Sequence, residues 1–144
     1  MLSEAHRRRL IAGRCWEVYD LIIRTFTVPA QFHSEFPELA EQATLAGALS
    51  LRVRIDQDRF LQIEEEYDFR ERELIVETYS YLLLNQALEV IIRADSLPHH
   101  QRDYRKRRLA HFPHHLHDEK GRIQSFTGRV DDFVTEVVTR LAHD

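Results

Sequence analysis

The sequence is poor in cysteine, in glycine and in long apolar runs, and each shortage excludes a class of protein. The single cysteine, Cys15, excludes an internal disulfide and any thiolate metal site that needs two sulfurs. Apolar neighbours along the chain predict that this thiol is buried rather than reactive. Only four glycines are present, and none forms a phosphate-cradling loop or a nucleophile elbow around a serine.

Membrane and secreted classes are also disfavoured. No run approaches the roughly 18 consecutive apolar residues of a membrane span, and the first nine residues lack the apolar centre of a signal peptide. We therefore expect a cytoplasmic protein that does not associate with a membrane. The net charge is −4, so any contact with nucleic acid requires a local basic patch.

What is present indicates one globular domain. The chain has 144 residues, of which 43% are hydrophobic and 31% charged, and this composition is typical of a folded protein. A single core usually serves chains of roughly 100 to 150 residues, which predicts one domain over 1–144. No internal repeat or low-complexity linker divides it.

Helical periodicity marks the two ends of the chain. Apolar residues recur at steps of three and four over about 3–22, and again over about 128–142, which predicts an N-terminal and a C-terminal helix. The stretch between the first helix and residue 48 is less regular. There, 22–28 could form a strand and 35–43 a short helix.

Alternating patterns between the two helices predict strands. Residues 49–55 alternate strictly between apolar and polar, 56–58 are turn formers, and 60–67 reads as the returning strand. Further strands are predicted at 74–84 and 87–93. Short connections imply an antiparallel meander of about four to six strands. The prediction is an α+β fold, with the sheet and a histidine-rich loop at about 48–124 and both terminal helices on one face.

The strongest chemical signal follows the fourth predicted strand. Six of the nine histidines lie there: His99, His100, His111, His114, His115 and His117. Between them runs a basic stretch, 102–108, with Tyr104 inside it. An isolated charge run is usually a solvated loop, but adjacent histidines favour a functional loop carried on a rigid sheet.

These residue types suit cleavage of RNA without a metal. Arginine holds phosphate through two parallel hydrogen bonds, and imidazole exchanges a proton near neutral pH. One histidine would take the 2′-hydroxyl proton, a second would protonate the departing 5′-oxygen, and an arginine would stabilise the phosphorane.

Two other interpretations of the region stay open. His115 and His117 would point to one side of an extended segment and could converge with His99 or His100 as metal ligands, although the spacing matches no established zinc pattern. Carboxylates form the second group. Glu64 and Glu66 should share one face and Glu65 the other, and their simplest role is a solvated strand face. Glu66 and Glu77 are secondary candidates for fixing a histidine tautomer.

The two histidine segments resemble a known family. Arg93-Ala94-Asp95-Ser96-Leu97-Pro98-His99-His100, followed by His111-Phe112-Pro113-His114-His115-Leu116-His117, is similar to two linked signatures of the TumE toxins, over about 49–141. The chain departs from the family at three positions: Ala94 replaces an aromatic residue, Ser96 an asparagine, and Leu82 a frequent histidine. The resemblance implies a toxin that acts on RNA and is neutralised by a helix-turn-helix antitoxin.

Together, the resemblance and the site chemistry predict a metal-independent endoribonuclease toxin without a cofactor. The alternative is a non-catalytic interaction or nucleic-acid-binding module with a structural or metal-stabilised histidine loop, and a homodimer is an open option for either. The catalytic candidates are His99, His100, His114, His115 and His117, with His100, His114 and His117 preferred. The substrate-binding candidates are Arg93, Arg105, Arg107, Arg108 and Tyr81. The supporting candidates are Glu66, Asp95 and His111.

Overall fold

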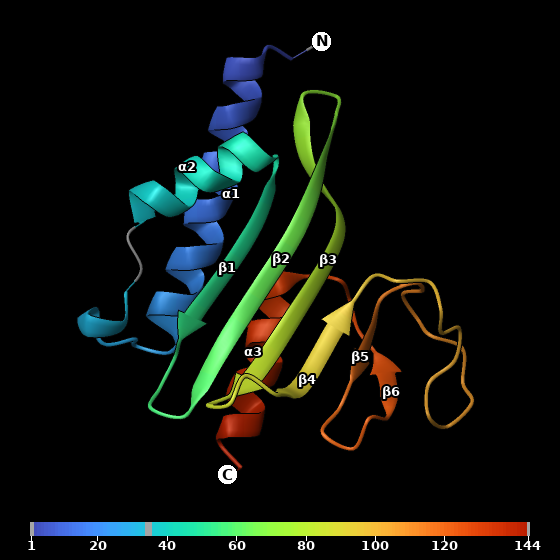
Figure 1. Cartoon of the computed structure of the whole chain (residues 1–144). Helices are drawn as coiled ribbons and strands as arrows, with labels where there is room; N and C mark the ends of the chain where they lie inside the picture. Colours follow the sequence, from blue (N-terminus) through green and yellow to red (C-terminus); the bar gives the residue numbers. More distant parts are fainter. Residues whose placement is uncertain (1, 34–35, 144) are drawn as a thin grey trace.

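The computed structural model describes residues 2–33 and 36–143, which form helices around one twisted sheet (Figure 1). In chain order the elements are α1 Glu4–Thr25, η1 Ala30–Phe32, α2 Phe36–Ala46, β1 Ala48–Arg54, β2 Arg59–Arg70, β3 Glu73–Asn85, β4 Val90–Asp95, β5 His115–His117, β6 Ile123–Ser125 and α3 Val130–Leu141.

The six strands form one antiparallel sheet in the order β1-β2-β3-β4-β5-β6, so each strand pairs with its neighbour along the chain. Figure 1 shows α1 and α3 side by side behind this sheet. The predicted α+β class, the meander and the two terminal helices are therefore confirmed.

Alternation divides the sheet into two faces. Leu49, Leu51 and Val53 of β1 are buried, and the register places Leu51 beside Ile63 and Val53 beside Leu61 of β2. Together these residues form the helix-covered face. Apolar stripes of both helices complete the core: Ile11, Cys15, Val18, Tyr19 and Ile22 from α1, and Val130, Phe133, Val134 and Val137 from α3.

The opposite face, called the open face below, is largely polar. One row of paired residues crosses the sheet as Ser50, Glu64, Ser80, Asp95, His115 and Ser125. The next row is Arg52, Gln62, Leu82, Arg93 and His117. Because side chains at paired positions share a face, the register of β4 with β5 decides where the histidines of β5 point.

Of the two elements predicted before β1, the strand is absent from the described residues and the short helix is present with shifted bounds. Residues 22–28 are not a strand, because Ile22 completes the buried stripe of α1, which continues to Thr25. Thr27, with a φ of 47°, lies in the turn that follows α1. The short helix expected at 35–43 is α2, which begins at Phe36 and ends at Ala46; position 35 lies outside the described residues.

Candidate functional site

The register between β4 and β5 builds the site. Asp95 pairs with His115 and Arg93 pairs with His117, so these four side chains start from one patch of the open face. The chain leaves β4 at Asp95, and His99 and His100 return over the same patch. A short connection and a short strand therefore bring two histidine pairs together from segments 15 residues or more apart in the sequence.

His99, His100, His115 and His117 form what is called below the four-histidine cluster. One ring nitrogen from each lies within 4.8 Å of those of the other three. The ring centroid of His115 lies 5.1 Å from that of His99, 5.1 Å from that of His100 and 5.0 Å from that of His117. His115 is fully buried and His99 is exposed, so the cluster extends from the sheet to the surface.

His115 is oriented by its surroundings. Its Nδ1 lies 2.9 Å from the carbonyl oxygen of Pro113, which can only accept, so Nδ1 carries a proton and donates it. Its Nε2 is the ring nitrogen left without a hydrogen bond; it lies 3.3 Å from Asp95 Oδ1, yet this contact does not have the geometry of a hydrogen bond. The Nε2 atoms of His115 and His117 are both buried without a hydrogen-bond partner.

Asp95 is a fixed acidic neighbour of the cluster. Its side chain is 1% exposed, its Oδ1 accepts from the backbone N–H of Leu97 at 3.0 Å, and its Oδ2 accepts from Arg93 Nε at 2.8 Å. These bonds hold the carboxylate in place beside His115. Asp95 was predicted from the sequence as a supporting residue, and in the structure it lies next to His115 of the cluster.

Burial and repulsion from neighbouring rings favour the neutral imidazole at His100 and His117. Burial and then the charges of His99 and His115 lower the pKa of His100. Burial and then the charge of His115 lower the pKa of His117. Neutral imidazole offers a lone pair to a metal ion or to a proton.

A pocket of about 330 Å³ adjoins the cluster on the open face. Its lining includes Glu64, Glu66, Ser80, Arg93 and Asp95. Alternation along the strands was the signal for the Glu64–Glu66 pair, but Ser80 was missed because a serine in a strand carries no chemical signature. Arg93 and Asp95 join the pocket to the histidines, so a bound molecule could reach both.

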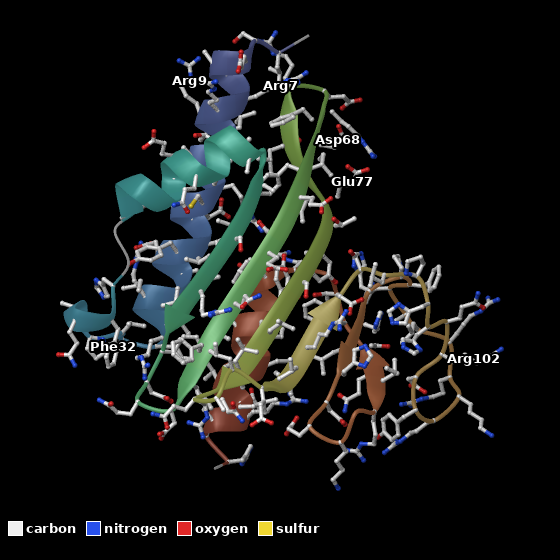
Figure 2. All side chains as sticks on the ribbon, viewed as in Figure 1. Arg7, Arg9, Phe32, Asp68, Glu77 and Arg102 are labelled. Carbon is white, nitrogen blue, oxygen red and sulfur yellow. The ribbon has the colours of Figure 1, made fainter. Side chains whose placement is uncertain are left out.

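The basic loop lies beyond the edge of this patch. Arg102 and Arg108 form an isolated bridge, and the backbone N–H groups of Arg105 and Arg107 donate to Asp103 Oδ1 at 2.9 Å. Figure 2 shows Arg102 on the outer side of this loop, past β5 and β6. Side chains of Arg105, Arg107 and Arg108 are exposed, as a phosphate-binding role requires.

His114 lies apart from the four-histidine cluster. Its Nδ1 is hydrogen-bonded to the Tyr79 hydroxyl at 2.9 Å, and the two rings stack with centroids 5.6 Å apart. Tyr79 belongs to the helix-covered face, where its ring also stacks on that of Tyr81. His111, at the exposed end of the loop, is on the His114 side: burial and then the charge of His111 lower the pKa of His114.

Two further candidates lie away from the cluster. Tyr81, expected to contact substrate, is fully buried on the helix-covered face, and its hydroxyl donates to Glu65 Oε2 at 2.6 Å. The β2–β3 register pairs Tyr81 with Ile63 of the core, so its side chain does not reach the open face where the histidines lie. Glu77 lies on the distal half of β3, far from the histidine loop in Figure 2.

Comparison with known proteins agrees with this arrangement. The family model described as toxin TumE matches residues 20–141, which is most of the chain. The chain belongs to the TumE toxin family. No curated protein and no solved structure gives a significant match to it.

As a TumE-family member, the chain is the toxin component of a toxin–antitoxin module, and an antitoxin partner is implied. Among the described residues, no helix is long and apolar enough to span a membrane. Both histidine segments that carry the resemblance lie within the matched range. The structure shows what two of the residues that depart from the TumE pattern do. Ala94 packs in the core, and the Ser96 hydroxyl accepts a hydrogen bond from the Tyr79 backbone N–H at 3.1 Å.

Proposed function

We propose that this toxin cleaves RNA and that the four-histidine cluster is its reaction centre. The observation that carries the proposal is the convergence of four imidazoles beside Arg93 and Asp95, on a sheet face that the basic loop borders. Imidazoles supply proton transfer or metal coordination, and arginine holds phosphate. A phosphodiester is the substrate that needs both functions at one place.

The basic loop supports a nucleic-acid substrate. The Arg105 guanidinium lies 5.2 Å from the centre of the Tyr104 ring, and the Arg122 guanidinium lies 4.9 Å from it. Because Tyr104 is exposed, its ring and these cations offer stacking and charge to a single strand. Because the net charge of −4 gives the chain no overall attraction for RNA, we expect binding to depend on a local basic patch such as this one.

Two chemistries would break the same bonds. The 2′-oxygen of the RNA would bond to phosphorus while the bond to the 5′-oxygen breaks, leaving a cyclic phosphate and a 5′-hydroxyl. In the metal-independent mechanism predicted from the sequence, one imidazole takes the 2′-hydroxyl proton and a second protonates the 5′-oxygen. In the other, the imidazoles would hold a metal ion that stabilises the developing charge, and water in the site would take the 2′-hydroxyl proton and supply one to the departing 5′-oxygen. The unpartnered buried nitrogens of His115 and His117 favour the second.

RNA binding provides the first test. The double variant Arg105→Ala, Arg108→Ala removes two charges from the basic loop, whereas Arg7→Ala, Arg9→Ala removes two from the start of α1, far from the loop in Figure 2. For a single strand, each lost phosphate contact reduces the slope of log affinity against log salt by about 0.7. We expect a reduction of about 1 to 1.5 in the loop variant and none in the α1 variant. Equal slopes in both variants would contradict this binding face.

A second candidate is a binding module that does not cut its ligand. The observation that favours it is the burial of His115, because a fully buried histidine also serves to hold a loop in place. This candidate predicts salt-sensitive RNA or antitoxin binding with no RNA fragments. A helix-turn-helix antitoxin and a toxin homodimer remain predictions for either function.

A further inference from the structure

We infer that His99, His100, His115 and His117 bind one divalent transition-metal ion, with zinc as the probe. The inference deepens the proposed function by naming the metal of the same site, and its catalytic meaning rests on that function. In a tetrahedral site with zinc–nitrogen bonds of about 2.0 to 2.1 Å, the ligand nitrogens lie about 3.3 Å apart. The four nitrogens here already lie within 4.8 Å of one another, so small side-chain rotations complete the site.

The tautomer of His115 is the first argument. Its Nδ1 proton is committed to the Pro113 carbonyl, so in the neutral ring Nε2 holds a lone pair. That lone pair is buried and lies 3.3 Å from Asp95 Oδ1, which also carries lone pairs. In the neutral ring, this lone pair would face a carboxylate oxygen with no proton between them, and a cation bound between the histidines would convert the repulsion into attraction.

A single added proton would give a partner to fewer of the buried ring nitrogens than a metal ion would. Protonating His115 would pair it with Asp95 but would leave His117 Nε2 buried without a partner. Protonating a second ring would place two positive charges on neighbouring imidazoles, whose centroids lie 5.0 Å apart for His115 and His117. One metal ion uses all four lone pairs at once.

The donor set decides which metals fit. Imidazole suits zinc, copper, nickel and iron, whereas magnesium and calcium prefer oxygen ligands. No thiolate takes part, because Cys15 is buried in α1. Asp95 supplies a negative charge next to the ligands, and the bonds from Arg93 and Leu97 fix its position. The Pro113 carbonyl, which accepts from the other ring nitrogen of His115, is the kind of outer partner that orients a metal-bound histidine.

Two properties of the site follow from where its ligands lie in the chain and from how exposed each one is. His115 and His117 belong to β5, whereas His99 and His100 belong to the loop after β4, so the ion would fasten the start of that loop to the sheet. His99 is the exposed member, so its position is the one that water or a phosphate oxygen reaches most easily. Exchange there would give the ion an open coordination position for chemistry.

The test measures metal binding by protein that carries no histidine tag. Chain stripped with a chelator is titrated with Zn²⁺ by calorimetry, its metal content is measured after dialysis, and Co²⁺ is used for a visible absorption spectrum. We expect one ion per chain and a tetrahedral or five-coordinate Co²⁺ spectrum. The variant His99→Ala should bind at least 10-fold more weakly, since even a lost neighbour of a ligand costs about 10- to 100-fold.

The matched control is His111→Ala, which removes an exposed histidine from the same loop and should leave the affinity unchanged. His99→Ala tests the site without disturbing buried packing, so loss of fold does not obscure the result. Absence of stoichiometric binding, or equal weakening in both variants, overturns the inference. RNA cleavage by zinc-free protein would also overturn its catalytic part, whereas an inactive chain that binds one ion keeps the metal site and removes the ribonuclease proposal.

Discussion

Replacing Glu65 by alanine should be among the most destabilising single changes in this chain. Glu65 is 1% exposed, and its carboxylate accepts from Arg14 Nε at 3.0 Å and from an Arg14 terminal nitrogen at 2.8 Å. It also accepts from the hydroxyls of Tyr67 at 2.8 Å and Tyr81 at 2.6 Å. The carboxylate therefore joins α1 to β2 and β3 behind the sheet.

The magnitude follows from what the substitution leaves behind. Arg14, whose side chain is 18% exposed, would keep only its longer ion pair with the exposed Glu17, at 3.4 Å, and two tyrosine hydroxyls would lose their acceptor. Burial by itself lowers the pKa of Arg14, but the hydrogen bond and charge of Glu65 outweigh it and raise that pKa. Removing one partner of a buried ion pair costs about 3–5 kcal/mol. For a chain of this size, we expect a fall in Tm of roughly 10 to 20 °C.

The assay is denaturant unfolding of Glu65→Ala beside Glu64→Ala, its exposed neighbour on the open face. The Glu64 variant should change the unfolding free energy by no more than about 0.5 kcal/mol. The pair Arg14→Met, Glu65→Leu should recover more than half of the loss, because no unpaired charge stays buried. A cost below about 1 kcal/mol for Glu65→Ala, or no recovery in the pair, would refute the reasoning.

Three further changes test separate parts of the structure. Gly128 has a φ of 89°, and an added Cβ would lie 2.7 Å from the His114 ring. Gly128→Ala should therefore lower the free energy of unfolding, measured with denaturant, by about 2–4 kcal/mol. A loss of less than about 0.5 kcal/mol would contradict this packing. Burial raises the pKa of the Cys15 thiol to about 11, so iodoacetamide at pH 8 should label unfolded but not native protein, and rapid native labelling would be inconsistent with that burial. Arg72 has a φ of 69° in the β2–β3 turn, so Arg72→Gly should raise the free energy of unfolding by about 0.5 to 1 kcal/mol. A lower free energy of unfolding in this variant would contradict the turn assignment.

The fold was predictable where the periodicity was long. The alternation from Leu49 onward fixes the face of β1, and the stripe of α3 runs for three turns, so both elements were expected close to their observed bounds. A short connection between 67 and 74 was expected, but not that the strands run on to a two-residue turn, because Glu71 and Arg72 adopt positive φ without the glycine or asparagine that usually marks such a turn. Strands of three residues, such as β5, are too short to show a period.

The histidines were recognisable from the sequence, and convergence of His115 and His117 with His99 or His100 was one open alternative, but the sequence did not decide between it and a grouping that includes His114. His115 and His117 alternate with Leu116 and so share a face, as expected for an extended segment. Which other histidines join them depends on the β4–β5 register, and this pairing is non-local. His114 was grouped with His117 in the sequence, yet one residue of alternation places it on the opposite side, against Tyr79.

Cleavage of a defined RNA by purified toxin, with and without bound zinc, tests the central claim most directly. Wild type and His111→Ala, each loaded with zinc, should cut the RNA and leave cyclic phosphate and 5′-hydroxyl ends. At a zinc concentration that just saturates the wild type, His99→Ala should lose most of this activity because it binds the ion more weakly, while its circular dichroism spectrum stays that of the folded chain. Intact RNA with folded, zinc-loaded wild type, or equal cleavage by His99→Ala, would contradict the four-histidine cluster as a reaction centre.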